Sequence, residues 1–134
     1  MQTCKVLDVG CGTGLIGKYL AEEGFKNIVG VDISSAMGMV AQQKGVYSKI
    51  HKIDLTEIES FQKAEIMNQF DIVCCSGLVN GNNMDYKLFE EFVLAAKQKG
   101  LIIFAARHSF IGEYWYSAIT RLMESEGRIR FLED

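Results

Sequence analysis

A glycine-rich segment near the start of the chain has the residue types needed to hold a nucleotide-like ligand. The segment contains Gly10, Gly12, Gly14 and Gly17. Glycine is required where the backbone turns sharply and a ligand approaches main-chain atoms closely. About 20 residues beyond these glycines, Asp32 ends a short apolar run, where a carboxylate can accept both hydroxyls of an adenosyl ribose. These residues predict a binding loop for a cofactor that contains adenosine.

Two cofactors fit this outline, and Asp8 distinguishes between them. The spacing Gly12-x-Gly14-x-x-Gly17 matches the dinucleotide pattern of NAD-dependent oxidoreductases. A carboxylate at Asp8, however, would repel a pyrophosphate bound at the helix N-terminus. It suits S-adenosylmethionine (SAM), which has an amino group, a carboxylate, a sulfonium and no phosphate. The SAM carboxylate could use the loop amides, while Asp8 supports the amino end directly or through backbone and water. SAM is therefore favoured, and NAD is the alternative.

Hydrophobic periodicity predicts the elements that position these residues. Strands are expected at 5–9, 27–32, 47–53, 70–75 and 101–106, with a half-exposed sixth strand at 128–133. Helices are expected after Thr13 as N-cap up to Gly24, after Ser34 or Ser35 up to Gly45, from Asp85 to Ala96, and through Trp115 to Gly127; 56–68 is a weak helix or a loop. This alternation predicts a parallel α/β sheet with right-handed crossovers.

Ligands of such sheets bind beyond the carboxyl ends of the strands, at the topological switch point. Functional residues are therefore expected just after Val9, Asp32, Ile53, Cys75 and Ala106.

Four motifs of the chain resemble those of class I SAM-dependent methyltransferases. Residues 6–14 (VLDVGCGTG) resemble the first motif, 30–34 (GVDIS) the second, 53–55 (IDL) the third and 70–73 (FDIV) the fourth, in the family's order and spacing. The resemblance implies a Rossmann-like three-layer αβα sandwich with a mostly parallel sheet of order 3-2-1-4-5 and a sixth strand beyond the fifth. It also implies that SAM is bound and S-adenosylhomocysteine (SAH) is released. More narrowly, 12–16, 32–37 and 76–78 resemble the methyltransferase-like 27 (Williams–Beuren region) group.

The same resemblance implies roles for single residues. Asp32 binds the ribose, Ile33 packs on adenine, and Asp54 meets the adenine amino group. The cofactor-binding residues that we expect are Asp8, Gly10, Cys11, Gly12, Thr13, Gly14, Asp32, Ile33, Met37, Asp54, Leu55 and Ser76.

No residue of the sequence is an unmistakable catalyst. The family places acceptor contacts after its fourth strand, which makes Ser76 and Asn80 candidates, although Ser, Asn and Gly also form plain turns. His108 follows the fifth strand and could act as a base or contact the substrate. A loop histidine without a role is the favoured interpretation of His108.

Composition narrows the class of protein further. The 134 residues, 49% of them hydrophobic, suffice for one domain with one core. Neither a signal peptide nor an apolar run of the ~18 residues that span a membrane is visible. Four cysteines without a CxxC pair or a histidine at zinc-ligand spacing predict no metal and a reducing, cytoplasmic compartment.

The acceptor of the methyl group is expected to be a small molecule. The net charge of −3 argues weakly against a surface that coats nucleic acid. The chain has no proline, so it lacks both the Asn-Pro-Pro-aromatic motif of amino-methylating nucleic-acid enzymes and the Pro-Cys motif of cytosine-C5 enzymes.

The ends of the chain depart from the family pattern. The family carries helical residues before its first strand and closes its sheet with a hairpin of strands six and seven. Here the first strand starts near Lys5 and the sequence ends at Asp134. We therefore expect a domain of residues 1–134 that has neither the N-terminal helices nor the C-terminal seventh strand. A non-catalytic SAM-binding module or fragment is therefore a third interpretation.

Overall fold

The computed structural model describes residues 3–55, 57, 59–79, 86–106 and 127. Within these described residues, nine elements follow one another: β1 (Lys5–Val9), α1 (Leu15–Glu22), β2 (Asn27–Asp32), α2 (Ser35–Gln43), β3 (Lys49–Lys52), α3 (Ser60–Lys63), β4 (Phe70–Val79), α4 (Tyr86–Ala95) and β5 (Ala96–Ala106). Strands and helices alternate, as the sequence predicts.

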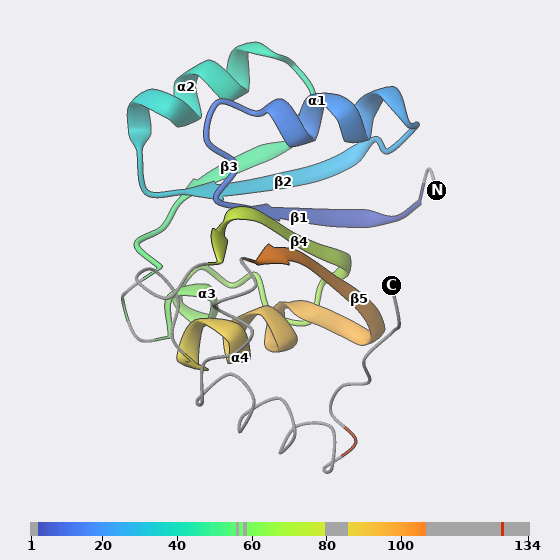
Figure 1. Cartoon of the computed structure of the whole chain (residues 1–134), viewed down its shortest axis with the longest axis vertical. Helices are drawn as coiled ribbons and strands as arrows, with labels where there is room; N and C mark the ends of the chain where they lie inside the picture. Colours follow the sequence, from blue (N-terminus) through green and yellow to red (C-terminus); the bar gives the residue numbers. More distant parts are fainter. Residues whose placement is uncertain (1–2, 56, 58, 80–85, 107–126, 128–134) are drawn as a thin grey trace.

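These strands form one parallel sheet of order β3-β2-β1-β4-β5. In its register, Leu7 of β1 lies opposite Val29 of β2 and Val73 of β4. Helices α1 and α2 cover one face of the sheet, and α3 and α4 cover the other (Figure 1). The predicted strand order and Rossmann-like layering are confirmed, and the switch point lies between β1 and β4, beyond their carboxyl ends.

Alternating side chains of the strands fill two separate cores, because successive residues of a strand point to opposite faces. The larger core, beneath α3 and α4, contains Leu7 and Val9 of β1 together with Phe61 and Phe92, whose rings stack at 6.3 Å. The smaller core, beneath α1 and α2, consists of Cys11, Ile28, Ala41 and Tyr47. Asp8 stands between Leu7 and Val9 and therefore faces the smaller core.

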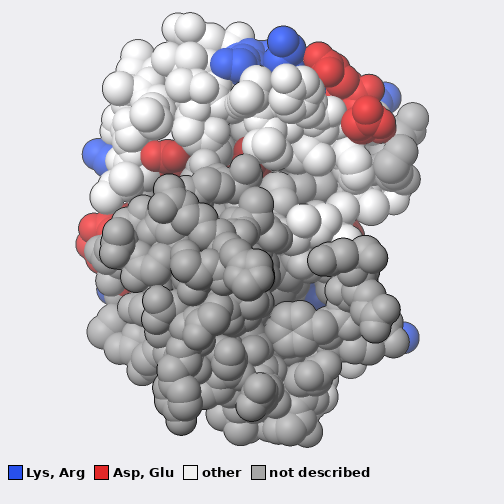
Figure 2. Space-filling model, viewed as in Figure 1, with Lys and Arg blue, Asp and Glu red and all other residues white. Residues whose placement is uncertain are grey.

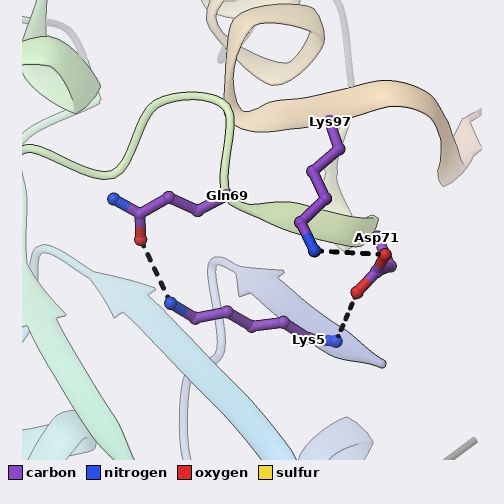
Figure 3. A network of polar contacts seen from close by, with 4 residues as sticks. All are labelled: Lys5, Gln69, Asp71 and Lys97. Atoms are coloured by element: carbon purple, nitrogen blue, oxygen red, sulfur yellow. Dashed lines mark hydrogen bonds and ion pairs between the residues drawn. The ribbon is translucent and has the colours of Figure 1, made fainter. Parts of the chain in front are cut away.

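Polar contacts join the amino ends of three strands (Figure 3). The Lys5 backbone N–H donates to Asp71 Oδ2 at 2.8 Å, and Lys97 Nζ lies 3.5 Å from Asp71 Oδ1. Lys5 Nζ reaches the other way and donates to Gln69 Oε1 at 3.1 Å. This network ties β1, β4 and β5 together at the end of the sheet opposite the glycine segment.

The first two strands and the Ser34 cap are confirmed, since Met37 N–H donates to Ser34 Oγ at 3.2 Å. Thr13 as N-cap is wrong. Helix α1 is capped by Gly14, whose φ of 93° places it in the left-handed region, with no side-chain capping bond. The weak helix predicted at 56–68 is the single turn α3.

Three strand boundaries differ from the prediction. Strand β3 is shorter than predicted at both ends, because its ladder with β2 runs only from the pair Val29–Lys49 to the pair Asp32–Lys52. Strand β4 continues past Cys75 to Val79, because Val79 still pairs with Ala106 after an irregularity in the ladder. Strand β5 begins at Ala96, and residues 97–100 bulge out between the pairs Phe70–Ala96 and Ile72–Leu101.

The predicted helix through Trp115 and the predicted sixth strand lie outside the described residues. Within the described part of the chain, no helix is both long and apolar enough to cross a membrane.

Candidate cofactor site

The glycine segment leaves β1 and folds over the end of β2. The N–H groups of Gly10 and Cys11 both donate to Val31 O, at 2.7 and 3.0 Å. Gly10 and Gly12 have φ angles of 70° and 55°, a region that side chains with a Cβ rarely adopt. These positive angles bring the main chain of residues 10–14 next to the carboxyl end of β2.

Asp32 ends β2 and is held from both sides by backbone amides. Its Oδ2 accepts from Gly12 N–H at 2.8 Å, and its Oδ1 accepts from Ser34 N–H at 2.9 Å. The carboxylate is partly exposed. Because each carboxylate oxygen has two lone pairs, both oxygens can still accept a ligand hydroxyl. The geometry thus joins the two predicted halves of the site, the loop and the acid.

Asp8 lies beneath the loop and is only 1% exposed. The Tyr47 hydroxyl donates to its Oδ2 at 2.6 Å. Burial raises the pKa of Asp8 to about 6; the charge of Asp32 raises this pKa as well, and the hydrogen bond from Tyr47 opposes the rise. Asp8 is therefore a buried acid that titrates close to neutral pH.

Tyr47 is the residue of this region that sequence reasoning missed. A Cβ added to Gly17 would lie 2.3 Å from the Tyr47 ring and hydroxyl, and one added to Gly14 or Gly30 would lie 3.1 Å from the ring. The absent side chain at Gly17 thus makes room for Tyr47. The third glycine of the Gly-x-Gly-x-x-Gly spacing was the available signal, because it marks close packing against the helix.

The remaining predicted cofactor residues occupy the same edge of the sheet. Ile33 and Met37 are 55% and 48% exposed. Asp54 and Leu55 follow β3, whose end is tied to β2 by the hydrogen bond from Ile53 N–H to Asp32 O at 3.1 Å. Leu55 packs against the larger core.

Two further side chains lie at the loop: Lys44, which bonds to its backbone, and the buried thiol of Cys11. Lys44 Nζ donates to Thr13 O at 2.6 Å and so links α2 to the loop. Burial raises the pKa of the Cys11 thiol to about 12, with added contributions from the charges of Asp8 and Asp32. Cys11 is neutral at physiological pH and is not a nucleophile there.

The surface over α1 and α2 is mostly uncharged in the view of Figure 2, with a run of basic and acidic groups at its upper right and a few charged groups elsewhere. The large apolar side chains of these two helices that are exposed are Leu15, Tyr19, Met37, Met39 and Val40. The face of the molecule beside the loop therefore suits an apolar or aromatic ligand group better than a polyanion.

Of the three residues predicted as candidates for substrate contact or catalysis, the structure describes the backbone of one, Ser76. Ser76 lies within β4, three residues before its end at Val79, so the expectation that the strand ends before Ser76 is wrong. Asn80 and His108 lie outside the described residues. In the part of the chain that the structure describes, no group of three or more His, Cys, Asp or Glu side chains could hold a metal ion.

A cavity of about 370 Å³ opens at the other edge of the sheet, at the amino ends of the strands. Lys5, Asn27, Lys49, His51, Glu65 and Phe70 are among the residues that line it. None of the predicted cofactor residues lines this cavity. The candidate site is therefore the carboxyl edge, where the glycine loop and Asp32 meet.

The fold is that of a Rossmann-like methyltransferase domain. A family model described as "Methyltransferase domain" matches residues 6–100. The chain therefore belongs to the methyltransferase-domain family.

Relatives and a solved structure agree with this assignment. The putative methyltransferase YqeM of Bacillus subtilis is 34% identical over 113 residues, which is 79% of this chain and 43% of that protein. The ubiquinone biosynthesis O-methyltransferase of Pseudomonas aeruginosa is 39% identical over 72 residues, 53% of this chain and 30% of that protein. A SAM-dependent methyltransferase from Mesorhizobium loti superposes with a TM-score of 0.64 at 23% identity, covering 78% of this chain and 47% of that one.

A shorter segment of the chain is similar to an enzyme whose name gives RNA as its substrate. The 18S rRNA (guanine-N(7))-methyltransferase of Bos taurus is 65% identical over 36 residues, 27% of this chain and 12% of that protein. The chain spans less than half the length of each of these four proteins.

Proposed function

We propose that this chain is the cofactor-binding domain of a SAM-dependent methyltransferase that acts on a small molecule and releases SAH. One observation carries the proposal. The Asp32 carboxylate is fixed by Gly12 N–H and Ser34 N–H, and it keeps free lone pairs at the edge of the glycine loop. This is the arrangement that two vicinal ribose hydroxyls require.

The charge beneath the loop supports SAM over NAD. Asp8 lies below residues 10–14, and its charge interacts with that of Asp32. Two carboxylates at one loop disfavour a pyrophosphate and favour a ligand with an amino group and a sulfonium. Because Asp8 is buried, we propose that it supports the amino end through the loop backbone rather than by direct contact.

The other residues of the site have roles within the same proposal. The main chain of Gly10, Cys11, Gly12, Thr13 and Gly14 wraps the methionine part of SAM. The exposed Ile33 and Met37 pack on the adenine ring. Asp54 receives the adenine amino group beside Leu55, and Ser76 approaches the methionine end from β4.

Methyl transfer in this site is an in-line displacement. The acceptor atom bonds to the methyl carbon as the carbon–sulfur bond breaks, and the sulfonium becomes the neutral thioether of SAH. Alignment alone can supply ~7–11 kcal/mol when the acceptor is a good nucleophile. A hydroxyl acceptor needs a general base, and Ser76, Asn80 and His108 are the candidates for substrate contact or base.

A small-molecule acceptor is supported by the likeness to the O-methyltransferase of ubiquinone biosynthesis. The 36-residue likeness to the rRNA enzyme makes RNA the competing acceptor class. The narrower likeness to the methyltransferase-like 27 group belongs to this proposal and rests on 12–16, 32–37 and 76–78. Four cysteines, none of them in a disulfide, support a cytoplasmic location.

Thermal melts with SAM, SAH, NAD and NADP test the cofactor. Ligand at ~100 times its Kd adds about 2.7 kcal/mol, which raises the Tm of a domain of this size by roughly 10 °C. We expect this rise with SAM and SAH alone. A rise with NAD alone would establish the dinucleotide alternative, and binding of SAH without turnover of any acceptor would establish the non-catalytic module.

Replacing the acid tests the ribose assignment. Asp32→Ala removes charge-assisted hydrogen bonds worth about 1.5–3 kcal/mol each, so we expect SAH affinity to fall by about 100-fold or more in isothermal titration. Glu22→Ala, which removes an exposed acid of α1, is the matched control and should bind as the parent does. Affinity of Asp32→Ala within about threefold of the parent (under ~0.7 kcal/mol) contradicts the assignment.

A further inference from the structure

Tyr47 is a buried polar side chain that the predicted cofactor site does not include. It precedes β3 and is 5% exposed. Its hydroxyl donates to Asp8 Oδ2 at 2.6 Å across a sequence separation of 39 residues. A buried tyrosine hydroxyl needs a hydrogen-bond partner, and here that partner is an ionisable acid whose charged form burial disfavours.

The ring of Tyr47 contacts three segments that shape the loop. Gly14 ends the loop, Gly17 lies in α1, and Gly30 lies in β2. At each of them a Cβ would come within 3.1 Å of the Tyr47 side chain, and at Gly17 within 2.3 Å. Tyr47 therefore fills the space between the loop, the first helix and the strand that ends in Asp32. Interiors packed at this density transmit a change at one side chain to its neighbours.

Tyr47 also opposes every other influence on Asp8. Among the residues that the structure describes, Tyr47, Asp32, Cys11 and Cys74 are the titratable groups that interact with Asp8. Burial and the Asp32 charge disfavour the ionised carboxylate, and the Tyr47 hydrogen bond favours it. Cys11 and Cys74 are neutral thiols, because burial raises the pKa of each to about 12. The hydroxyl of Tyr47 is thus the group that keeps Asp8 ionised toward lower pH.

We propose that Tyr47 is a positioning residue of the cofactor site. Its hydroxyl holds the Asp8 carboxylate beneath the loop, and its ring sets the spacing of the loop against α1 and β2. A ligand with a cationic amino group then meets the loop amides, whose placement depends on the Tyr47 ring. The negative charge of Asp8 beneath these amides depends on the Tyr47 hydroxyl. The inference rests on the proposed function for the identity of that ligand, and on the hydrogen bond from the Tyr47 hydroxyl for the Asp8 contact.

The test compares Tyr47→Phe with Tyr19→Phe. Tyr19 lies on α1 and is 53% exposed, so its variant makes the same chemical change outside the site. Isothermal titration with SAH from pH 5 to 8 should give about tenfold weaker binding for Tyr47→Phe at pH 7. The pH at which affinity is half lost should move upward from its value near 6, because Asp8 loses the hydrogen bond that favours its charge. Tyr19→Phe should change neither quantity.

A ligand-free measurement separates this inference from the proposed function. The Tm of the apo protein between pH 4 and 8 should show a transition that moves upward in Tyr47→Phe. An unmoved transition together with unchanged SAH affinity would overturn the positioning role. If the parent binds no SAH at any pH, the proposed function fails, and the apo transition alone decides the role of Tyr47. If Tyr47→Phe does not fold, Tyr47→His keeps a ring that can donate a hydrogen bond and is used in its place. Asp8→Asn then shows whether the transition belongs to Asp8, and a transition that persists in Asp8→Asn overturns the inference.

Discussion

Two aspartates on neighbouring strands of this sheet have opposite surroundings. Asp8 of β1 is buried at the carboxyl edge, where it accepts from the Tyr47 hydroxyl. Asp71 of β4 is partly exposed at the amino edge, where it accepts from Lys5 N–H and faces Lys97 (Figure 3). Burial raises the pKa of Asp8 to about 6, whereas the hydrogen bond from Lys5 N–H, helped by the charge of Lys97, lowers the pKa of Asp71.

The two edges of the sheet therefore differ: the contacts of Asp71 tie strands together, whereas Asp8 lies buried beside the site that we propose for the cofactor. At the amino edge, Asp71 has both a backbone and a lysine partner and has access to water, so its contacts tie strands together. At the carboxyl edge an acid is held in a site that disfavours its charge. Perturbed acids of this kind cluster where a protein binds or transforms a ligand, and their cost is tolerated because surrounding packing holds them in place.

The largest loss of stability should come from Gly17→Ala, which disrupts the packing around Tyr47 and Asp8. The new methyl group would lie 2.3 Å from atoms of the Tyr47 ring, and the hydrogen bond to Asp8 restrains that ring. We expect the free energy of unfolding to fall by about 3 kcal/mol, at the upper end for overpacked cores. Urea denaturation measures it.

The matched control for this variant is Gly38→Ala in α2. A Cβ at Gly38 makes only an ordinary contact of 3.6 Å with Ile50. Alanine favours a helix interior over glycine, so this variant should match the parent or exceed it by up to about 1 kcal/mol. Equal stability of the two alanine variants would refute the close packing of Tyr47 against Gly17.

A comparable effect, visible only as a pH dependence, should follow from Asp8→Asn. The folded-state pKa of Asp8 is raised from 3.8 to about 6, so its protonated form stabilises the fold fully below pH 4, and this contribution is lost as pH rises through 6. Two units correspond to about 3 kcal/mol. We expect the parent to lose about that much stability, relative to Asp8→Asn, between pH 4 and 7 in urea titrations.

Asp71→Asn should change the dependence of stability on pH in the opposite direction, at the acidic end of the same titration. The pKa of Asp71 is lowered in the fold, so its contribution is present above pH 4 and is lost as pH falls below that value. The two asparagine variants thus test one comparison with opposite signs. Parallel curves for both variants would remove the distinction drawn between the two edges.

The smallest effect is expected from Lys97→Met. This variant removes an ion pair whose two side chains are 49% and 35% exposed and whose atoms lie 3.5 Å apart. Exposed ion pairs contribute little because water and salt screen them. The Tm should stay within experimental error at both low and high salt. A clear loss of Tm that added salt abolishes would show the amino edge to be more than a surface tie.

Much of the fold was accessible from the sequence, for local reasons. The bounds of β1 and β2 were predicted as they occur, because each is a short apolar run between turn residues. Ser34 was one of the two predicted caps of α2, since such a cap depends on a hydroxyl and an amide three residues apart; the structure selects Ser34 over Ser35. Of the site, the glycine loop and Asp32 were accessible because motif spacing encodes their neighbourhood.

The contacts that escaped prediction join distant residues. Ser76 and Gly77 are typical of a turn, yet β4 runs through them because the ladder with β5 resumes at Val79 and Ala106. Thr13 is a good capping residue, yet the left-handed backbone of Gly14 takes that place. In both cases a tertiary constraint overrides a local preference.

By itself, the sequence determined that a glycine loop follows the first strand, that an acid ends the second, and that the strands are parallel. These features depend on periodicity and on spacing along the chain. Only the tertiary structure decided that Asp8 is buried and that Tyr47, 39 residues away, holds its carboxylate. Burial and pairing depend on which side chains fill the space between α1, α2 and the sheet, and no local pattern records how that space is filled.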